Sequence, residues 1–163
     1  NHYAQKLAMP YDSGGELAKS GKILPLILKQ LESLPYYKQA YPKSLGVEWV
    51  HREFMPILKT SKAKEEDVLR TCIAHFVSQI AQQLNPGSSV LVTGGGAYNR
   101  FLLEQIQASI DVTLAVPNKT LIEFKEALIF GLLGVLKLRD EVNCLSSVTG
   151  ASKDHSSGVV FLN

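Results

Sequence analysis

The chain has 163 residues, of which 45% are apolar and 20% are charged, proportions typical of a globular protein with its own buried core. Its 17 basic residues are scattered and the net charge is only +2, so neither a nucleic-acid partner nor a membrane partner is expected. Two widely separated cysteines without metal-ligand spacing favour a reduced, cytoplasmic protein.

Four short helices are expected in the first 60 residues, separated by turns rich in proline and glycine. They cover residues 1–8, 16–19, 22–34 and 47–59. Pro35 ends the third helix, and Pro56 is expected to break the fourth, because proline lacks the N–H group that a helix interior uses. The first helix begins in mid-element at Asn1, which suggests a fragment of a longer protein.

The clearest helical pattern covers residues 65–84, where apolar side chains recur at helical spacing. The stripe consists of Leu69, Ile73, Phe76, Ile80 and Leu84. Cys72 and His75 lie three positions apart on this helix and could share a metal ion. No third ligand is nearby, so the pattern favours packing roles for both side chains.

A glycine turn, residues 94–96, follows directly after a short apolar strand at 89–92. Asn99 then stands where a new helix should start. Gly94, Gly95 and Gly96 lack Cβ atoms, so a ligand can approach the backbone closely and positive φ angles are allowed. Free N–H groups at such a helix start favour an anion, above all a phosphate. A tight turn without any ligand is the alternative.

A second strand at residues 110–116 is followed by a long helix at 120–138, with Thr120 as its expected cap. From residue 127 onward the helix is apolar on nearly every face, so we expect it to be the most buried element and to pack on the sheet that holds residues 90–93. Residues 159–162 predict a terminal strand. Either the domain is helix-rich on a small sheet, or strands that precede Asn1 complete the sheet.

Five motifs together resemble the C-terminal part of the anhydro-N-acetylmuramic acid kinase family. They are Tyr11-Asp12-x-x-Gly15-x-x-Ala18-x-Ser20-Gly21-Lys22, Pro42-Lys43-Ser44-x-Gly46, Gly94-Gly95-Gly96-Ala97-x-Asn99, Glu126-Ala127 and Ser147-Val148-Thr149-Gly150-Ala151. Each motif is short, and the order and spacing of all five make the resemblance specific. Residues 118–125 depart from the family pattern, and so does Ser146, where many members have proline.

This resemblance implies an α/β fold: the helix-rich C-terminal half of a ribonuclease-H-like, actin-like ATPase fold with a small sheet. Residues 1–163 would form a single domain, and the N-terminal domain with the phosphate loop and the catalytic aspartate would lie upstream of Asn1. The implied enzyme is a sugar kinase that opens the anhydro bond of 1,6-anhydro-N-acetylmuramic acid with water and phosphorylates O6 with ATP, in bacterial cell-wall recycling. Mg²⁺ would be held mainly by the nucleotide, and a homodimer is compatible with this reading.

The resemblance also suggests roles for individual residues. The backbone of Gly94, Gly95 and Gly96 would lie against ATP, with Tyr98 at the border of the site. Asn99 would contact the site or act only as a helix cap. Glu126 would orient water or a sugar hydroxyl as a supporting catalytic acid, or would only be a first-turn acid favoured by the helix dipole. Lys43 and Ser44 would touch the nucleotide or be plain loop residues.

Two other classes of protein remain open. The chain could be a non-catalytic nucleotide-binding domain of the heat-shock or actin ATPase type, which would bind ATP but no sugar. It could also be an interaction module that binds neither. Separate measurements of nucleotide binding and anhydro-sugar binding distinguish all three, and the fragment alone is expected to be inactive because both walls of the cleft are needed.

Overall fold

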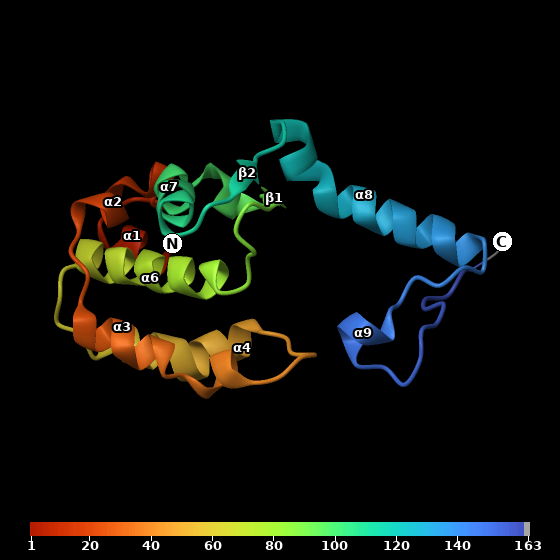
Figure 1. Ribbon diagram of the computed structural model, residues 1–163, viewed down its shortest axis with the longest axis horizontal. Helices are drawn as coiled ribbons and strands as arrows, with labels where there is room; N and C mark the ends of the chain where they lie inside the picture. Colours follow the sequence, from red (N-terminus) through yellow and green to blue (C-terminus); the bar gives the residue numbers. More distant parts are fainter. Residues whose placement is uncertain (162–163) are drawn as a thin grey trace. The chain divides into compact units, whose positions relative to one another are not determined.

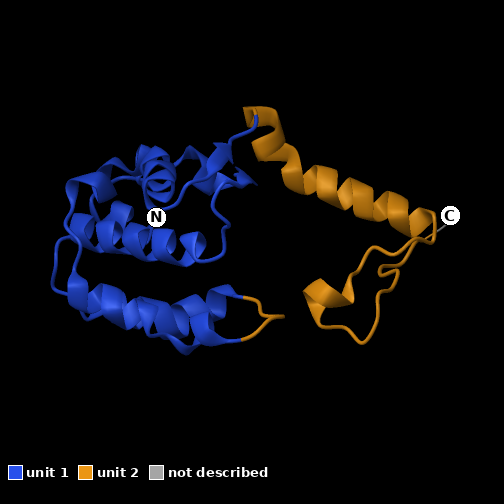
Figure 2. Cartoon of the chain, viewed as in Figure 1, with its two compact units in different colours: residues 1–39, 45–117 blue, residues 40–44, 118–163 orange. Residues whose placement is uncertain are grey.

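The computed structural model describes residues 1–161, which fall into two compact units (Figure 2). Unit 1 comprises residues 1–39 and 45–117, and unit 2 comprises residues 40–44 and 118–163, of which the last two lie outside the described part. The fold is α/β and helix-rich, as expected. The expectation of one domain over residues 1–163 stays a prediction, and each unit is described here by itself.

Unit 1 is built around the long helix α6 (Glu65–Ala81), which confirms the clearest prediction from the sequence. Figure 1 shows it between two groups of shorter elements. One group contains α1 (His2–Lys6), η1 (Ser13–Gly15), α2 (Glu16–Ser20) and α7 (Arg100–Ser109). The other group contains α3 (Pro25–Glu32), η2 (Pro35–Lys38) and the helical segment of residues 47–59. Three acidic residues in the first turn of α6 complement its helix dipole.

The helix expected to break at Pro56 runs on through that residue. It consists of α4 (Val47–Trp49), the π-helical segment η3 (Val50–Phe54) and α5 (Met55–Lys59). Pro56 lies in the first turn of α5, where its missing N–H is tolerated, and the wider π turn immediately before it absorbs the irregularity. The prediction of a break was therefore wrong, because the sequence pattern does not reveal π turns.

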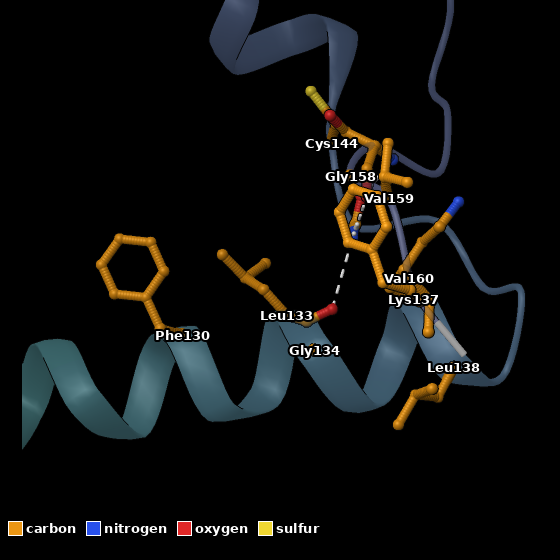
Figure 3. Close-up of a pocket in the computed structure, with 12 residues that line it drawn as sticks. Phe130, Leu133, Gly134, Lys137, Leu138, Cys144, Gly158, Val159 and Val160 are labelled. Atoms are coloured by element: carbon orange, nitrogen blue, oxygen red, sulfur yellow. Dashed lines mark hydrogen bonds between the residues drawn. The ribbon is translucent and has the colours of Figure 1, made fainter. Parts of the chain in front are cut away.

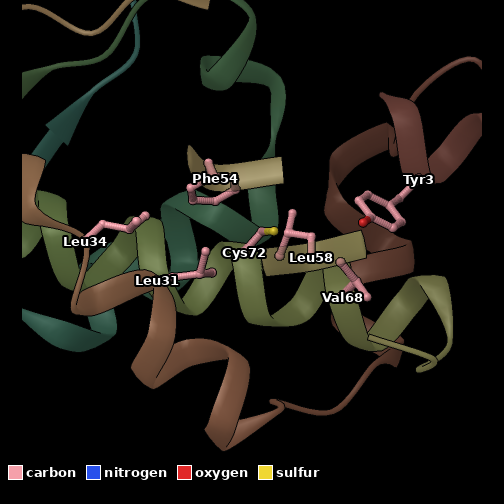
Figure 4. Packing of buried hydrophobic residues seen from close by; sticks show 7 residues of the cluster. All are labelled: Tyr3, Leu31, Leu34, Phe54, Leu58, Val68 and Cys72. Carbon is pink, nitrogen blue, oxygen red and sulfur yellow. The ribbon is translucent and has the colours of Figure 1, made fainter. Parts of the chain in front are cut away.

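Two hydrophobic clusters fill unit 1, one on each side of α6. The first, shown in Figure 4, contains Tyr3, Leu31, Leu34, Phe54, Leu58, Val68 and Cys72. The second contains Ala18, Ile73, Val77, Phe101, Ile106 and Val112. Burying one large aliphatic side chain contributes about 1.5–3 kcal/mol, so these clusters are the main stabilising feature of unit 1.

The two strands expected around the glycine turn form a parallel pair. β1 (Ser89–Leu91) lies beside β2 (Thr113–Ala115), with Val90 opposite Leu114. The chain crosses from one to the other through η4 (Gly95–Tyr98) and α7. Parallel strands end at the same edge of a sheet, so this connection places the glycine turn directly beyond the carboxyl end of β1.

Unit 2 consists of α8 (Lys119–Leu138), the short helix α9 (Ser146–Thr149) and extended segments. Asn118, and not the expected Thr120, caps α8: its side chain accepts a hydrogen bond from the N–H of Leu121 at 2.9 Å. The expected terminal strand is absent from residues 159–161, and residue 162 lies outside the described part. In its place Cys144 and His155 form an antiparallel bridge.

The prediction that the long helix is the most buried element was wrong. Ile122 is the one buried residue of α8, whereas Phe130 is 71% and Leu138 is 70% exposed. A Cβ atom placed at Gly131 or Gly134 would meet nothing within 4 Å, so these glycines mark no close packing among the described residues. Apolar composition indicates that a helix needs cover, but it does not identify the surface that provides it. Despite the 20 residues of α8, no helix within residues 1–161 has the length and apolarity of a membrane crossing.

Candidate functional site

The glycine turn leaves backbone donors free at the end of β1. No hydrogen bond within residues 1–161 uses the N–H groups of Gly95 and Gly96. Ala97 stabilises the turn, because its N–H donates to the carbonyl of Gly94 at 3.0 Å and its side chain is buried. Two adjacent free N–H groups beside a buried anchor form a concave site suited to an anion.

The three glycines are not equivalent. Gly94 has φ +72° and ψ −174°, a conformation that essentially only glycine adopts, so the fold itself requires it. Gly95 and Gly96 are not at positive φ, and a Cβ atom on either would meet nothing within 4 Å. Of the three glycines, only Gly94 therefore uses the positive φ that glycine allows. Neither backbone conformation nor packing within residues 1–161 explains why Gly95 and Gly96 lack side chains.

Asn99 is a helix cap, as one of its two expected roles requires. Its side-chain Oδ1 accepts a hydrogen bond from the N–H of Leu102 at 3.0 Å, and its own N–H donates to the carbonyl of Gly96 at 3.1 Å. The side-chain amide nitrogen has no hydrogen bond within the described residues. Capping therefore does not exclude a ligand contact, and that second role stays a prediction.

A loop from the first motif faces the glycine turn across a cavity of about 500 Å³. We call residues 11–15 the Asp12 loop. Both carboxylate oxygens of Asp12 accept hydrogen bonds from the start of α2, from the N–H of Leu17 at 2.8 Å and of Ala18 at 3.0 Å. Arg100 and Glu16 form an exposed ion pair between α7 and α2 at 3.3 Å. Two motifs far apart in the sequence thus share one cavity, which the sequence analysis did not predict.

The cavity combines polar backbone with aromatic and apolar side chains. Its lining includes Tyr11, Asp12, Leu69, Cys72, Phe76, Gly95, Gly96, Tyr98 and Asn99. Tyr11 and Tyr98 are exposed, as a border position requires. Burial raises the pKa of the Cys72 thiol to about 12, so this cysteine stays protonated and is unsuited to nucleophilic or metal chemistry.

No cluster of three or more metal-ligating side chains exists within residues 1–161. Cys72 belongs to the first core cluster, and His75 is fully buried with its Nε2 atom 2.9 Å from the hydroxyl of Tyr37. The free N–H groups beside the cavity are suited to an anion.

Glu126 lies on an exposed part of α8, in unit 2. It is the eighth residue of that helix, so the alternative of a first-turn acid favoured by the dipole does not apply. Within the described residues Glu126 makes no ion pair. Lys43 lies with its ammonium 5.1 Å from the ring centre of Tyr41, and Ser44 is exposed. The expected roles of these three residues stay predictions.

The motif at residues 147–151 forms the end of α9. Gly150 adopts φ +74° and its N–H donates to the carbonyl of Ser146 at 2.8 Å, which closes the helix. Asp154, which the sequence analysis missed, accepts hydrogen bonds from both the hydroxyl and the N–H of Ser146 at 2.7 Å. These bonds, the hydroxyl first, lower the pKa of Asp154. Asp154 lies eight residues after Ser146, so no local capping pattern in the sequence indicated this contact.

Unit 2 also contains an apolar groove of about 800 Å³ beside the second half of α8 (Figure 3). Phe130, Leu133, Cys144 and Val160 contribute to its lining, and the side-chain amide of Asn143 donates to the carbonyl of Leu133 at 3.3 Å. The groove is larger than the cavity at the glycine turn. Its polar groups are largely occupied by one another, so the cavity in unit 1 is the better candidate for binding a charged ligand.

Comparison with known proteins identifies the family of this chain. The sequence profile of the anhydro-N-acetylmuramic acid kinase family matches residues 2–163. Proteins named anhydro-N-acetylmuramic acid kinase from Sulfurimonas denitrificans, Shewanella putrefaciens and Variovorax paradoxus are 30%, 32% and 29% identical to this chain. The alignments cover 93%, 93% and 99% of this chain, but only 45%, 43% and 46% of those relatives.

The helix-rich α/β fold, with a parallel strand pair and an open glycine turn, is consistent with part of a kinase domain. The profile match over nearly the whole chain is more specific. This chain belongs to the anhydro-N-acetylmuramic acid kinase family, and it spans less than half the length of the curated relatives that it matches.

Proposed function

We propose that this chain forms the nucleotide-contacting part of an enzyme that uses ATP to phosphorylate O6 of 1,6-anhydro-N-acetylmuramic acid. In the proposed reaction water adds across the anhydro bond, and the freed O6 takes the terminal phosphoryl group of ATP, leaving ADP. The family membership supports the kinase class. The catalytic aspartate and the phosphate loop would come from the part of the relatives that this chain does not match.

The observation that supports this proposal most strongly is the free face of the glycine turn. The N–H groups of Gly95 and Gly96 lack partners within the described residues, and the space in front of both Cα atoms is open. Unpaired N–H groups are unfavourable unless water or a ligand satisfies them. The backbone at this turn would donate hydrogen bonds to the nucleotide, and Asn99 would hold the turn in place.

The remaining groups have supporting roles in this proposal. ATP would bring Mg²⁺, which neutralises developing charge on the transferred phosphoryl group. Tyr98 would border the nucleotide. Glu126 would orient water or a sugar hydroxyl from α8 once the rest of the protein completes the site. The same missing part would supply cover for the apolar surface of α8, and the reaction would take place in the cytoplasm.

Separate titrations of ATP and the anhydro-sugar in the complete protein test the proposal. Gly95→Val places a side chain in the open space. It should not strain the backbone, because Gly95 is not at positive φ, and a Cβ atom there meets no protein atom within 4 Å. We expect weaker ATP binding by about tenfold or more, nearly unchanged sugar binding and an unchanged melting temperature. Gly131→Val, at another glycine that has open space and no positive φ, is the control for added bulk outside the turn.

Unchanged ATP affinity in a folded Gly95→Val protein would rule out the nucleotide role of the turn. A protein that binds ATP but no anhydro-sugar would instead support a non-catalytic ATPase-type domain. A protein that binds neither ligand would support an interaction module. Steady release of ADP by this chain alone, in the presence of both substrates, would show that the assignment of the catalytic aspartate to the missing part is wrong.

A further inference from the structure

Gly15, the last residue of the Asp12 loop, lies directly against the start of α7. Its φ is +81°, and a Cβ atom there would lie 2.3 Å from Oδ1 of Asn99 and 2.7 Å from Cβ of Phe101. Real Cβ atoms do not approach other atoms so closely, so any side chain at this position displaces one of its neighbours. Glycine is required here both by backbone conformation and by the direct contact between the Asp12 loop and the start of α7.

Asn99 connects that contact to the glycine turn. Its backbone N–H donates to the carbonyl of Gly96, and its side chain caps α7 through the N–H of Leu102. A displacement of Asn99 therefore acts on the carbonyl of Gly96 and on the first turn of α7 at the same time. The position of the proposed nucleotide-binding N–H groups therefore depends on Asn99 as well as on the hydrogen bond from Ala97 to Gly94.

Of the two segments that meet at Gly15, the Asp12 loop is held more firmly than Asn99. Both carboxylate oxygens of Asp12 are bonded to the N–H groups of Leu17 and Ala18, and the N–H of Gly15 donates to the carbonyl of Asp12 at 3.3 Å. Ala18 is only 1% exposed and belongs to the second core cluster. Because the loop is fixed to α2 and through α2 to the core, added bulk at Gly15 should displace Asn99 more readily than it displaces the loop.

We propose that the Asp12 loop is a positioning element for the nucleotide site and that it acts through the contact of Gly15 with Asn99. The proposal rests on the proposed function, since it concerns catalysis only if the glycine turn binds ATP. Gly15 and Asp12 need not touch the nucleotide. They hold Asn99, and through it Gly96, in the geometry in which the free N–H groups meet the ligand.

Gly15→Ala in the complete protein tests this role, with Gly14→Ala as a matched control. Gly14 has nearly the same backbone conformation, φ +66°, and lies in the same loop, but a Cβ atom there meets only the flexible side chain of Arg100, at 3.4 Å. Both variants bear the cost of alanine at positive φ, and only Gly15→Ala presses on Asn99. The difference between them isolates the contact.

We expect Gly15→Ala to raise the Kd for ATP by about tenfold or more, because displacements of about 1 Å at a binding site have effects of this size. The affinity for the anhydro-sugar and the kcat at saturating ATP should change little. Gly14→Ala should raise the Kd for ATP by a clearly smaller factor. Equal effects of the two variants on ATP, or an unchanged Kd in folded Gly15→Ala, would overturn the positioning role.

Gly95→Val distinguishes a failure of this proposal from a failure of the proposed function. If Gly95→Val weakens ATP binding and Gly15→Ala does not, the site is correct and the positioning role is wrong. If neither weakens it, the nucleotide site itself is wrong. Should Gly15→Ala fail to fold, Asp12→Asn replaces it: loosening the cap of α2 should weaken ATP binding and not sugar binding, and unchanged ATP affinity in that variant would overturn the proposal.

Discussion

The two units of this chain place their apolar side chains in opposite ways. Unit 1 buries its apolar side chains in two clusters around α6, whereas Ile122 is the one buried residue among the described residues of unit 2. The difference does not follow from hydrophobicity, because α8 is the more apolar helix. It depends on whether several elements of one unit pack against one another and so bury their apolar side chains. A helix that is apolar on every side requires cover from elements that its own unit does not supply.

The glycines show the same contrast on a smaller scale. Gly95 and Gly134 both have open space where a Cβ atom would lie. Among residues 1–161 the N–H groups of Gly95 and Gly96 have no hydrogen-bond partner and both glycines line a cavity, whereas Gly134 lies within the hydrogen-bonded interior of α8. Open space alone therefore does not indicate a binding site. Open space combined with unpaired donors does.

The largest expected effect concerns the core of unit 1. Leu31→Ala removes a fully buried side chain and should lower the free energy of unfolding by about 2–5 kcal/mol. Leu132→Ala on the exposed face of α8 should change it by less than about 0.5 kcal/mol in this chain. Urea unfolding measures both. Equal losses would show that α8 is buried after all, and a large loss for Leu132→Ala only in the complete protein would show that the missing part covers it.

A smaller effect separates the glycines of the turn. Gly94→Ala should cost about 1–3 kcal/mol of stability, because its backbone conformation is essentially restricted to glycine. Gly95→Ala has no such strain and should leave stability nearly unchanged. Thermal melting of the two variants measures the difference. A stable Gly94→Ala together with a destabilised Gly95→Ala would contradict the turn geometry described here.

About half of the site could be predicted from the sequence. Local signals identified α6, the strand before the glycines and the cap at Asn99, because each depends on neighbouring residues. The contact of Gly15 with Asn99 could not be predicted, because it joins residues as far apart in the sequence as Glu16 and Arg100, whose ion pair spans 84 positions. The cap at Asn118 was missed because Thr120, two residues later, is also a preferred capping type.

The smallest expected effect is the pH dependence that His75 gives to the stability of unit 1. Burial lowers the pKa of His75 below its ordinary value of 6.5. Its Nδ1 atom has no partner within the described residues, so a second proton would have no acceptor. The unfolded chain therefore takes up this proton at a higher pH than the folded chain. The stabilising contribution of neutral His75 is complete above pH 6.5 and decreases as the pH falls toward the lowered pKa.

Hydrogen exchange at pH 5.5 and 7.5 locates this effect. Protection in α3 and α6 should decrease at the lower pH, and His75→Gln, which keeps a polar partner for Tyr37, should reduce the pH dependence. Among the described residues unit 2 buries no ionisable side chain, so α8 should show no matching loss. A larger pH-dependent loss in α8 than in α6 would contradict the comparison between the units.

The most direct test of the central claim is the response of the Gly95 and Gly96 amides to ATP. Nitrogen-15 spectra of the complete protein, recorded during an ATP titration, report on each backbone N–H separately. We predict that both signals shift and saturate together with ATP binding, while the amide of Ala97, already bonded to Gly94, shifts less. Saturable binding of ATP with the Gly95 and Gly96 signals unmoved would show that the nucleotide binds elsewhere.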